Sequence, residues 1–162
     1  MHGQSRVVRR AYLSLGSNLG DRVDCLVRGV AIVAGVDDHR LSLVYETEPV
    51  GGVEQDDFWN LVLEVTTDAT PRELLERGRE AERACERRRE VHFGPRTLDV
   101  DVLLVGHEVS DDPDILVPHP RLWERSFVLV PLHELAPELV SQAQLAGGVG
   151  RVRALATLES LR

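Results

Sequence analysis

The sequence contains no lysine: all 19 of its basic residues are arginine. A P-loop needs a lysine for its phosphates, and a Schiff base or an amine general base needs one as well, so these sites are excluded. If the protein handles phosphate groups, then arginine side chains, backbone amides or a bound metal ion must do so. This limits the chemistry that the remaining motifs can support.

Long hydrophobic runs are also missing. No stretch approaches the roughly 18 apolar residues of a membrane-spanning helix, and no signal-peptide pattern is present. We therefore expect a cytoplasmic protein with no membrane partner. The net charge of −8 argues against nucleic acid as a partner. With 162 residues, of which 43% are hydrophobic, the chain fits one globular domain over residues 1–162.

Cysteine is scarce, with Cys25 and Cys85 as the two instances. Their spacing matches no metal-binding motif. Each falls on the apolar stripe of an expected helix, and buried cysteines in an intracellular protein are usually free thiols. We therefore expect two buried free thiols rather than a disulfide.

The pattern of apolar residues alternates between strand and helix periods. Apolar–polar alternation predicts strands at residues 7–15, 40–46, 58–66 and 98–104. Helical spacing predicts helices over residues 23–33 and, after a Thr-Pro-Arg-Glu capping box, from residue 71 onward. The order strand, helix, strand, strand, helix, strand predicts an α+β fold with a ferredoxin-like βαββαβ core, an antiparallel sheet with helices on one face, and C-terminal additions. From Gly147 onward the chain looks peripheral.

The fourth expected strand carries an acidic pair. Strand alternation places Leu98, Val100, Val102 and Leu104 on one face, and Asp99 and Asp101 on the other, roughly 7 Å apart between Cα atoms. A divalent cation would relieve the repulsion between the two carboxylates, and Mg²⁺ binds such pairs together with water and phosphate oxygens. An edge strand whose charges deter aggregation would show the same pattern. Both interpretations remain open on these residues alone.

Two other groups of residues are candidates for ligand contacts. Phe58 and Asn60 share one face of the clearest strand, where they could hold a planar, hydrogen-bonding heterocycle, although these residues alone favour a strand end with one exposed Phe. His119 lies between two prolines and is followed by Arg121 and Arg125, a combination that favours phosphate binding.

Taken together, these segments resemble the 6-hydroxymethyl-7,8-dihydropterin pyrophosphokinase family. The run Gly-Pro-Arg-Thr-Leu-Asp-Val-Asp is highly specific, whereas the other matching stretches are weak individually. In order along the chain, the matching stretches are Tyr12 to Gly20, Tyr45 to Gly51, Gln55 to Asn60, Phe93 to Asp101 and Val117 to Phe127.

The resemblance implies a transfer of pyrophosphate from ATP to a hydroxymethyldihydropterin, which releases AMP in folate biosynthesis. It implies that Asp99 and Asp101 hold two Mg²⁺ ions, and that Arg96 and Arg87 neutralise the transferring phosphates as catalytic residues. Two sets of binding residues follow from the same resemblance. The ATP set is Glu82, Arg87, Arg89, Arg96, His119 and Arg125, and the pterin set is Thr47, Val50, Phe58, Asn60, Phe93 and Phe127.

The chain departs from the family pattern at two positions. Phe93 stands where Trp is usual, and His92 stands where Arg is usual, which removes an indole donor and a permanent charge. Two alternative functions remain, a metal-dependent nucleotidyltransferase and a non-catalytic ferredoxin-like ligand-binding module. The expected partners are small-molecule substrates, and we expect a monomer.

Overall fold

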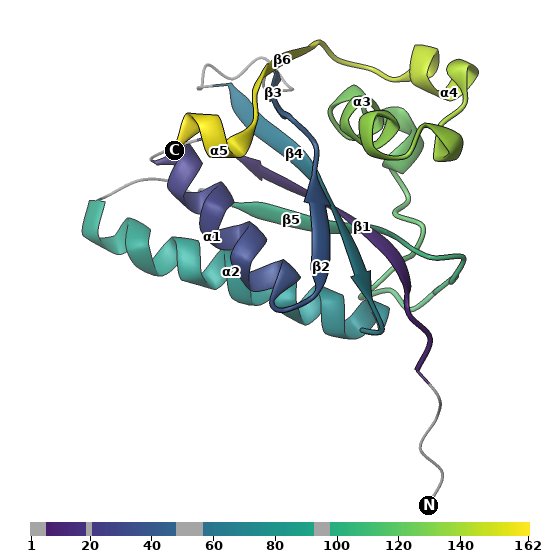
Figure 1. Ribbon diagram of the computed structural model, residues 1–162, viewed down its shortest axis with the longest axis horizontal. Helices are drawn as coiled ribbons and strands as arrows, with labels where there is room; N and C mark the ends of the chain where they lie inside the picture. Colours follow the sequence, from purple (N-terminus) through teal and green to yellow (C-terminus); the bar gives the residue numbers. More distant parts are fainter. Residues whose placement is uncertain (1–5, 19–20, 48–56, 93–97) are drawn as a thin grey trace, which may run out of the picture.

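The computed structural model describes residues 6–18, 21–47, 57–92 and 98–162, and for residues 87–92 it describes the backbone alone. Six described strands form one antiparallel sheet, in which β5, β1, β4, β3 and β6 lie side by side and β2 also pairs with β4 (Figure 1). The strands are β1 (Arg9–Ser17), β2 (Asp38–Leu41), β3 (Val44–Thr47), β4 (Phe58–Thr67), β5 (Asp99–Val105) and β6 (Val152–Ala156).

Two long helices, α1 (Arg22–Ala34) and α2 (Pro71–His92), pack against one face of this sheet (Figure 1). Helix α2 begins where the capping box predicts. The Thr70 hydroxyl accepts a hydrogen bond from the Glu73 amide at 3.1 Å, and the Glu73 carboxylate accepts one from the Thr70 amide at 2.9 Å. The predicted ferredoxin-like α+β core is therefore confirmed.

The second predicted strand is divided into β2 and β3 in the structure. Ser42, between the two strands, exchanges two hydrogen bonds with Val62 of β4: its hydroxyl accepts from the Val62 amide at 2.9 Å, and its own amide donates to the Val62 carbonyl at 3.0 Å. This local interruption explains why one alternating run of sequence forms two short strands along the same neighbour.

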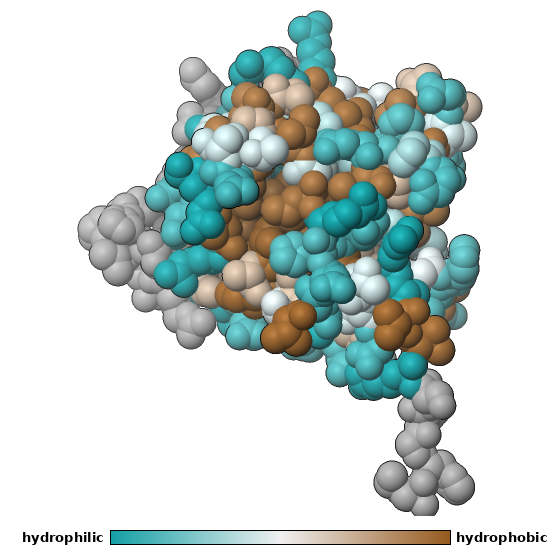
Figure 2. Space-filling view, in the orientation of Figure 1, coloured by the Kyte–Doolittle hydropathy of each residue, from teal (hydrophilic) through white to brown (hydrophobic). Residues whose placement is uncertain are grey.

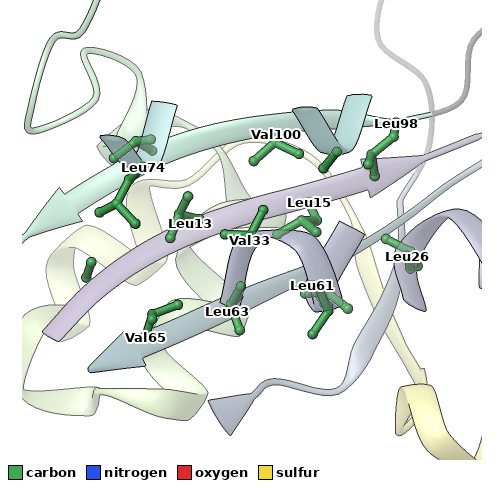
Figure 3. Close-up of a cluster of buried hydrophobic side chains, with 14 of the residues drawn as sticks. Leu13, Leu15, Leu26, Val33, Leu61, Leu63, Val65, Leu74, Leu98 and Val100 are labelled. Carbon is green, nitrogen blue, oxygen red and sulfur yellow. The ribbon is translucent and has the colours of Figure 1, made fainter. Parts of the chain in front are cut away.

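The main hydrophobic core lies between the sheet and the two long helices (Figure 3). Alternate residues of β1 and β4 point into it, as the period of two predicts. Each fully buried Leu or Val stabilises the fold by roughly 1.5–3 kcal/mol through removal of apolar surface from water. The members labelled in Figure 3 are Leu13, Leu15, Leu26, Val33, Leu61, Leu63, Val65, Leu74, Leu98 and Val100.

Cys25 and Cys85 form a disulfide between α1 and α2, with a Cα–Cα distance of 5.7 Å. The prediction of two free thiols is therefore wrong. Both cysteines do lie on apolar helix stripes, and they are 6% and 1% exposed. Because α1 and α2 lie against each other on the sheet, the two stripes bring the sulfur atoms together. The apolar stripe of one helix alone does not show which residue of the other helix it will contact, so it could not predict the disulfide.

A second hydrophobic core lies on the opposite face of the sheet. Helix α3 (Ser126–Leu135) and the short 3-10 helix η1 (Leu122–Glu124) pack there over Tyr12, Val62 and Leu103. These segments are the C-terminal additions that the sequence predicts. In Figure 2 the middle of the molecule, where the sheet is seen between the two helical layers, is largely hydrophobic and is surrounded by hydrophilic side chains.

The predicted alternation along β5 holds only as far as Val102. The pairing register with β1 shifts there, since Leu13 pairs with Val102 whereas the neighbouring Tyr12 pairs with Leu104. As a result Leu104 packs against the second core rather than the first, and Val105 turns back to the first core. The prediction that Leu104 shares a face with Val100 is wrong because of this bulge.

The C-terminal region is not peripheral. After η2 (Pro137–Leu139) and α4 (Gln142–Gly147), β6 pairs with β3 and extends the sheet, and α5 (Leu158–Leu161) packs against α1. The expectation that the chain beyond Gly147 is peripheral is therefore wrong. Among the described helices, none is long and apolar enough to cross a membrane.

Candidate functional site

A cavity of about 750 Å³ lies over the part of the second sheet face that α3 and η1 leave uncovered. Its floor is formed by Ser14 and Gly16 of β1 and Asn60 of β4. The remaining walls come from α2, β3 and β5, from η1 and the start of α3, and from the segment that leads into β6. The cavity therefore collects residues that lie far apart in the sequence.

The acidic pair lines one side of this cavity. Asp99 and Asp101 of β5 pair with Gly16 and Ser14 of β1, and both carboxylates belong to the cavity wall, as strand alternation predicts. Glu82 of α2 lines the same side, where its carboxylate accepts a hydrogen bond from the Val100 amide at 2.9 Å. Burial raises the pKa of Glu82, and the negative charges of Asp99 and Asp101 raise it further against the opposing effect of that amide. Three carboxyl groups therefore lie together on this side of the cavity, and Glu82 binds a proton more readily than an exposed glutamate.

The carboxylates suit a hard divalent cation that brings other ligands with it. Within the described ranges, no group of three or more His, Cys, Asp or Glu side chains is arranged to hold a metal ion. A complete protein cage of the kind typical of structural zinc or calcium is therefore absent from that part of the chain. Mg²⁺ differs, because one or two carboxylates, water and substrate phosphates are enough for it. Asp99 and Asp101 fit that requirement.

His119 lies beside the acidic pair, where its amide donates a hydrogen bond to the Leu103 carbonyl of β5 at 2.9 Å. Its Nε2 lies 3.8 Å from the Asp101 carboxylate, and its Nδ1 accepts a hydrogen bond from the Arg121 amide at 3.1 Å. Burial lowers the pKa of His119, and Arg125 and Arg121 lower it further, while Asp101 opposes the shift. The ring is therefore neutral at pH 7 and carries its hydrogen on Nε2, which makes that atom a hydrogen-bond donor toward the cavity.

A slot for a flat ring lies beside the acidic pair. Phe58 and Phe127 both line the cavity, and Asn60 of the floor donates a hydrogen bond from Nδ2 to the Thr47 hydroxyl at 2.7 Å. A Cβ atom on Gly16 would overlap the Asn60 side-chain oxygen, so this oxygen lies directly over the glycine. Two aromatic rings and a fixed amide form a typical site for a planar heterocycle.

Arginine side chains supply positive charge around the opening. Arg121, Arg125 and Arg151 line the cavity, and in the described part of the chain none of them takes part in an ion pair. Arg125 also lies over the Phe127 ring, with its guanidinium carbon 5.4 Å from the ring centroid. Unpaired guanidinium groups beside carboxylates are suited to bind the phosphate oxygens of a metal-bound ligand.

The structure adds residues that the sequence analysis missed. Val149, Gly150, Arg151 and Val152 line the cavity, although they belong to the region expected to be peripheral. The sequence holds only a weak signal for them, the closely spaced glycines before two arginines. Their place in the wall follows from the pairing of β6 with β3, which joins segments about a hundred residues apart.

Several predicted site residues lie outside the described part of the chain. These are Val50, Phe93 and Arg96, and His92 is described only in its backbone. Arg87 and Arg89 lie in the last turns of α2, where the structure likewise describes the backbone alone. The predicted residues that line the cavity are Thr47, Phe58, Asn60, Glu82, Asp99, Asp101, Arg125 and Phe127. His119 lies next to the lining residue Asp101, at 3.8 Å.

Comparison with known proteins gives a consistent set of relatives. A model of the 7,8-dihydro-6-hydroxymethylpterin-pyrophosphokinase family matches residues 12–137. A 2-amino-4-hydroxy-6-hydroxymethyldihydropteridine pyrophosphokinase of Bacillus subtilis is 43% identical over 139 residues, which cover 84% of this chain and 83% of the relative. Proteins with the same name from Methylorubrum extorquens and Aquifex aeolicus are 44% and 35% identical, over 81% and 80% of this chain and 85% and 81% of their own lengths.

Proposed function

The chain belongs to the 7,8-dihydro-6-hydroxymethylpterin-pyrophosphokinase family, and we propose that the cavity over β1, β4 and β5 is where it carries out the reaction of that family. In this reaction the enzyme transfers pyrophosphate from its co-substrate ATP to the hydroxyl group of a 6-hydroxymethyl-7,8-dihydropterin, in folate biosynthesis. The observation that carries the assignment to this cavity is the slot for a flat ring directly beside an acidic pair.

In the ring slot, Phe58 and Phe127 would hold the pterin between their faces, and Asn60 would bond its polar edge. Thr47 fixes the Asn60 amide by accepting its hydrogen bond at 2.7 Å, which leaves the Asn60 oxygen and the second amino hydrogen for the ligand. Val50 and Phe93 complete this pocket by the family resemblance, and they lie outside the described residues.

On the acidic side, Asp99 and Asp101 would hold two Mg²⁺ ions between them. When bound, such ions neutralise phosphate charge and stabilise the attacking and leaving oxygens. Other residues of the chain would bind ATP. The His119 Nε2 hydrogen and the Arg125 guanidinium would bind phosphate oxygens, and Glu82 and Arg89 would lie near the nucleotide. Arg96 and Arg87 would neutralise the transferring group, by the family resemblance.

Catalysis in this arrangement depends on position and electrostatics. Phosphoryl-type transfer asks little covalent chemistry of the protein, and correct placement of two reactants supplies a large part of the rate enhancement. The ring slot and the acidic side meet at Gly16, which pairs with Asn60 on one side and with Asp99 on the other. A pterin in the slot would therefore place its hydroxymethyl group beside the carboxylates.

The reaction products provide the test. The protein is incubated with ATP, Mg²⁺ and 6-hydroxymethyl-7,8-dihydropterin, and AMP and ADP are measured together with the modified pterin. We expect one AMP for each pterin diphosphate and no ADP. AMP joined covalently to the pterin would indicate a nucleotidyltransferase instead, and ligand binding with no turnover would indicate a binding module.

Further parts of the proposal concern the protein as a whole. We propose that residues 1–162 form one domain and that the protein acts as a cytoplasmic monomer, without nucleic acid or membrane as a partner. The net charge of −8 supports the absence of nucleic acid. Light scattering would test the monomer, since a dimer would have twice the mass of 18.1 kDa.

A further inference from the structure

A short segment that leads into β6, residues 148–152, contributes four lining residues to the cavity, and we name it the C-terminal strap. It lies beyond the residues that the family model matches, which end at residue 137. At the N-terminal end of the strap, the Val149 amide donates a hydrogen bond to the Glu124 carbonyl at 2.9 Å, and the Val149 carbonyl accepts one from the Ser126 amide at 3.1 Å. At its other end, Val152 pairs with Thr47 of β3. The strap is therefore held at both ends by segments that carry site residues.

Two glycines allow the strap to lie against the cavity. A Cβ atom on Gly148 would come within 2.8 Å of the Ser126 hydroxyl and 3.0 Å of a Leu129 methyl group, so only glycine fits this approach without movement of its neighbours. Gly150, which lines the cavity, has a φ of +107°, a conformation that other residues rarely adopt. The conformation of the strap is thus specified by its own sequence.

Arg151 is the charged residue of the strap that lines the cavity. In the described part of the chain it has no ion pair, whereas Arg153, two residues later, pairs with Glu46 at 2.7 Å and lies outside the cavity wall. The two arginines have the same chemistry and neighbouring positions, yet only Arg151 presents an uncompensated guanidinium to the cavity. A ligand with acceptor atoms would satisfy its donors.

The position of Arg151 in the sheet indicates which ligand it faces. The strap enters β6, which lies at one edge of the sheet, while Asp99 and Asp101 lie on β5 at the other edge. Four strand spacings separate these edges, roughly 19 Å. Next to β6 is β3 with Thr47, and then β4 with Phe58 and Asn60. The backbone at Arg151, which leads into β6, is therefore closer along the sheet to Thr47, Phe58 and Asn60 than to the acidic pair.

We infer that Arg151 is a further substrate-binding residue and that it binds the pterin ring rather than the triphosphate. Asn60 offers the ligand an acceptor oxygen, and the bond from one of its amino hydrogens to Thr47 fixes the orientation of the amide. Arg151 supplies the complementary donors for the carbonyl oxygen and ring nitrogens of a pterin. This inference rests on the proposed function, since it requires the pterin to occupy the slot formed by Phe58, Asn60 and Phe127.

The test compares Arg151→Ala with Arg153→Ala as the matched control. The dissociation constant for 6-hydroxymethyl-7,8-dihydropterin is measured by calorimetry with Mg²⁺ and a saturating non-hydrolysable ATP analogue, and the dissociation constant for the analogue is measured separately. Arg151→Ala should weaken pterin binding about tenfold or more, because a hydrogen bond from a charged group is lost. Affinity for the analogue should stay within about twofold, and Arg153→Ala should change neither constant.

Unchanged pterin affinity in Arg151→Ala would overturn the inference, and so would an equal loss of affinity for the ATP analogue. If Arg151→Ala does not fold by circular dichroism, then Arg151→Gln, which removes the charge and shortens the side chain but keeps it polar, replaces it with the same expected outcomes. Failure of the proposed function is recognised separately, because the unmodified protein would then bind no pterin and release no AMP.

Discussion

The side-chain oxygen of Asn60 lies directly over the Cα atom of Gly16, in the space that any other side chain at position 16 would fill. The two residues pair across β1 and β4, and Asn60 is held in place by its hydrogen bond to Thr47. Gly16 also pairs with Asp99 on its other side. This one glycine therefore leaves room for the amide that the ring slot needs, beside the acidic pair.

Replacing Gly16 with alanine should damage ring binding and leave the fold intact. The new methyl group would displace the Asn60 amide, and loss of its hydrogen bond to the pterin should weaken pterin binding about tenfold. Calorimetry with the pterin measures this effect. Gly147→Ala is the matched control, because nothing lies within 4 Å of a Cβ there, and it should bind the pterin normally. Equal affinities in both variants would contradict this role for Gly16.

The disulfide should contribute to stability more than to the chemistry of the site. It closes a segment with a sequence separation of 60, for which the chain-entropy estimate is about 4 kcal/mol. The variant with both Cys25→Ser and Cys85→Ser should therefore unfold at lower urea concentration, with a free energy of unfolding lower by about 2–4 kcal/mol. The unmodified protein kept in dithiothreitol until both thiols are free should match the variant. An unchanged urea midpoint in both would refute the prediction.

The buried carboxylate of Glu64 should make stability depend on pH in the acid range. Arg40 donates two hydrogen bonds to it at 2.8 Å each, and Tyr12 donates a third at 2.8 Å. Hydrogen bonds from Arg40 and then Tyr12 lower the pKa of Glu64 below its ordinary 4.5, although burial opposes the shift. Because the folded pKa lies below the unfolded one, this stability is present above about pH 4.5 and is lost as the pH falls through the folded pKa.

This pH dependence is tested by measuring the free energy of unfolding of Glu64→Gln and of the unmodified protein as a function of pH. At pH 7 the variant should be less stable by about 2 kcal/mol, because a charged acceptor of several hydrogen bonds is lost. The difference should shrink as the pH falls below 4.5 and through the folded pKa, because the carboxylate itself becomes protonated. Glu159→Gln, at an exposed position in α5, is the control and should show no such difference. A difference that is constant from pH 7 to pH 3 would exclude the proposed linkage.

Local patterns in the sequence predict those structural features that depend on residues close together in the chain. The alternation along β5 places Asp99 and Asp101 on one face, and the capping box marks the start of α2 at Pro71. These features follow from strand period and helix-end chemistry, which act over a few residues. The order of the elements then leads to the ferredoxin-like core, because that order admits few sheet topologies.

Features that depend on tertiary packing were not predictable in the same way. The face of Leu104 depends on a bulge against β1, and the Cys25–Cys85 bond depends on how α1 and α2 lie together. The cavity position of Arg151 depends on the pairing of β6 with β3, which no local pattern encodes. In each case a contact between distant segments decides the outcome.

The central claim, that pyrophosphate transfer takes place at the acidic pair, is tested most directly by AMP release from Asp99→Asn and Asp101→Asn. With saturating ATP, pterin and Mg²⁺, we expect each variant to lose at least about 1,000-fold in rate while it keeps its fold, because an amide binds Mg²⁺ poorly. Asp111→Asn, on an exposed loop, is the control and should retain full activity. Near-normal AMP release from folded Asp99→Asn and Asp101→Asn would contradict the account.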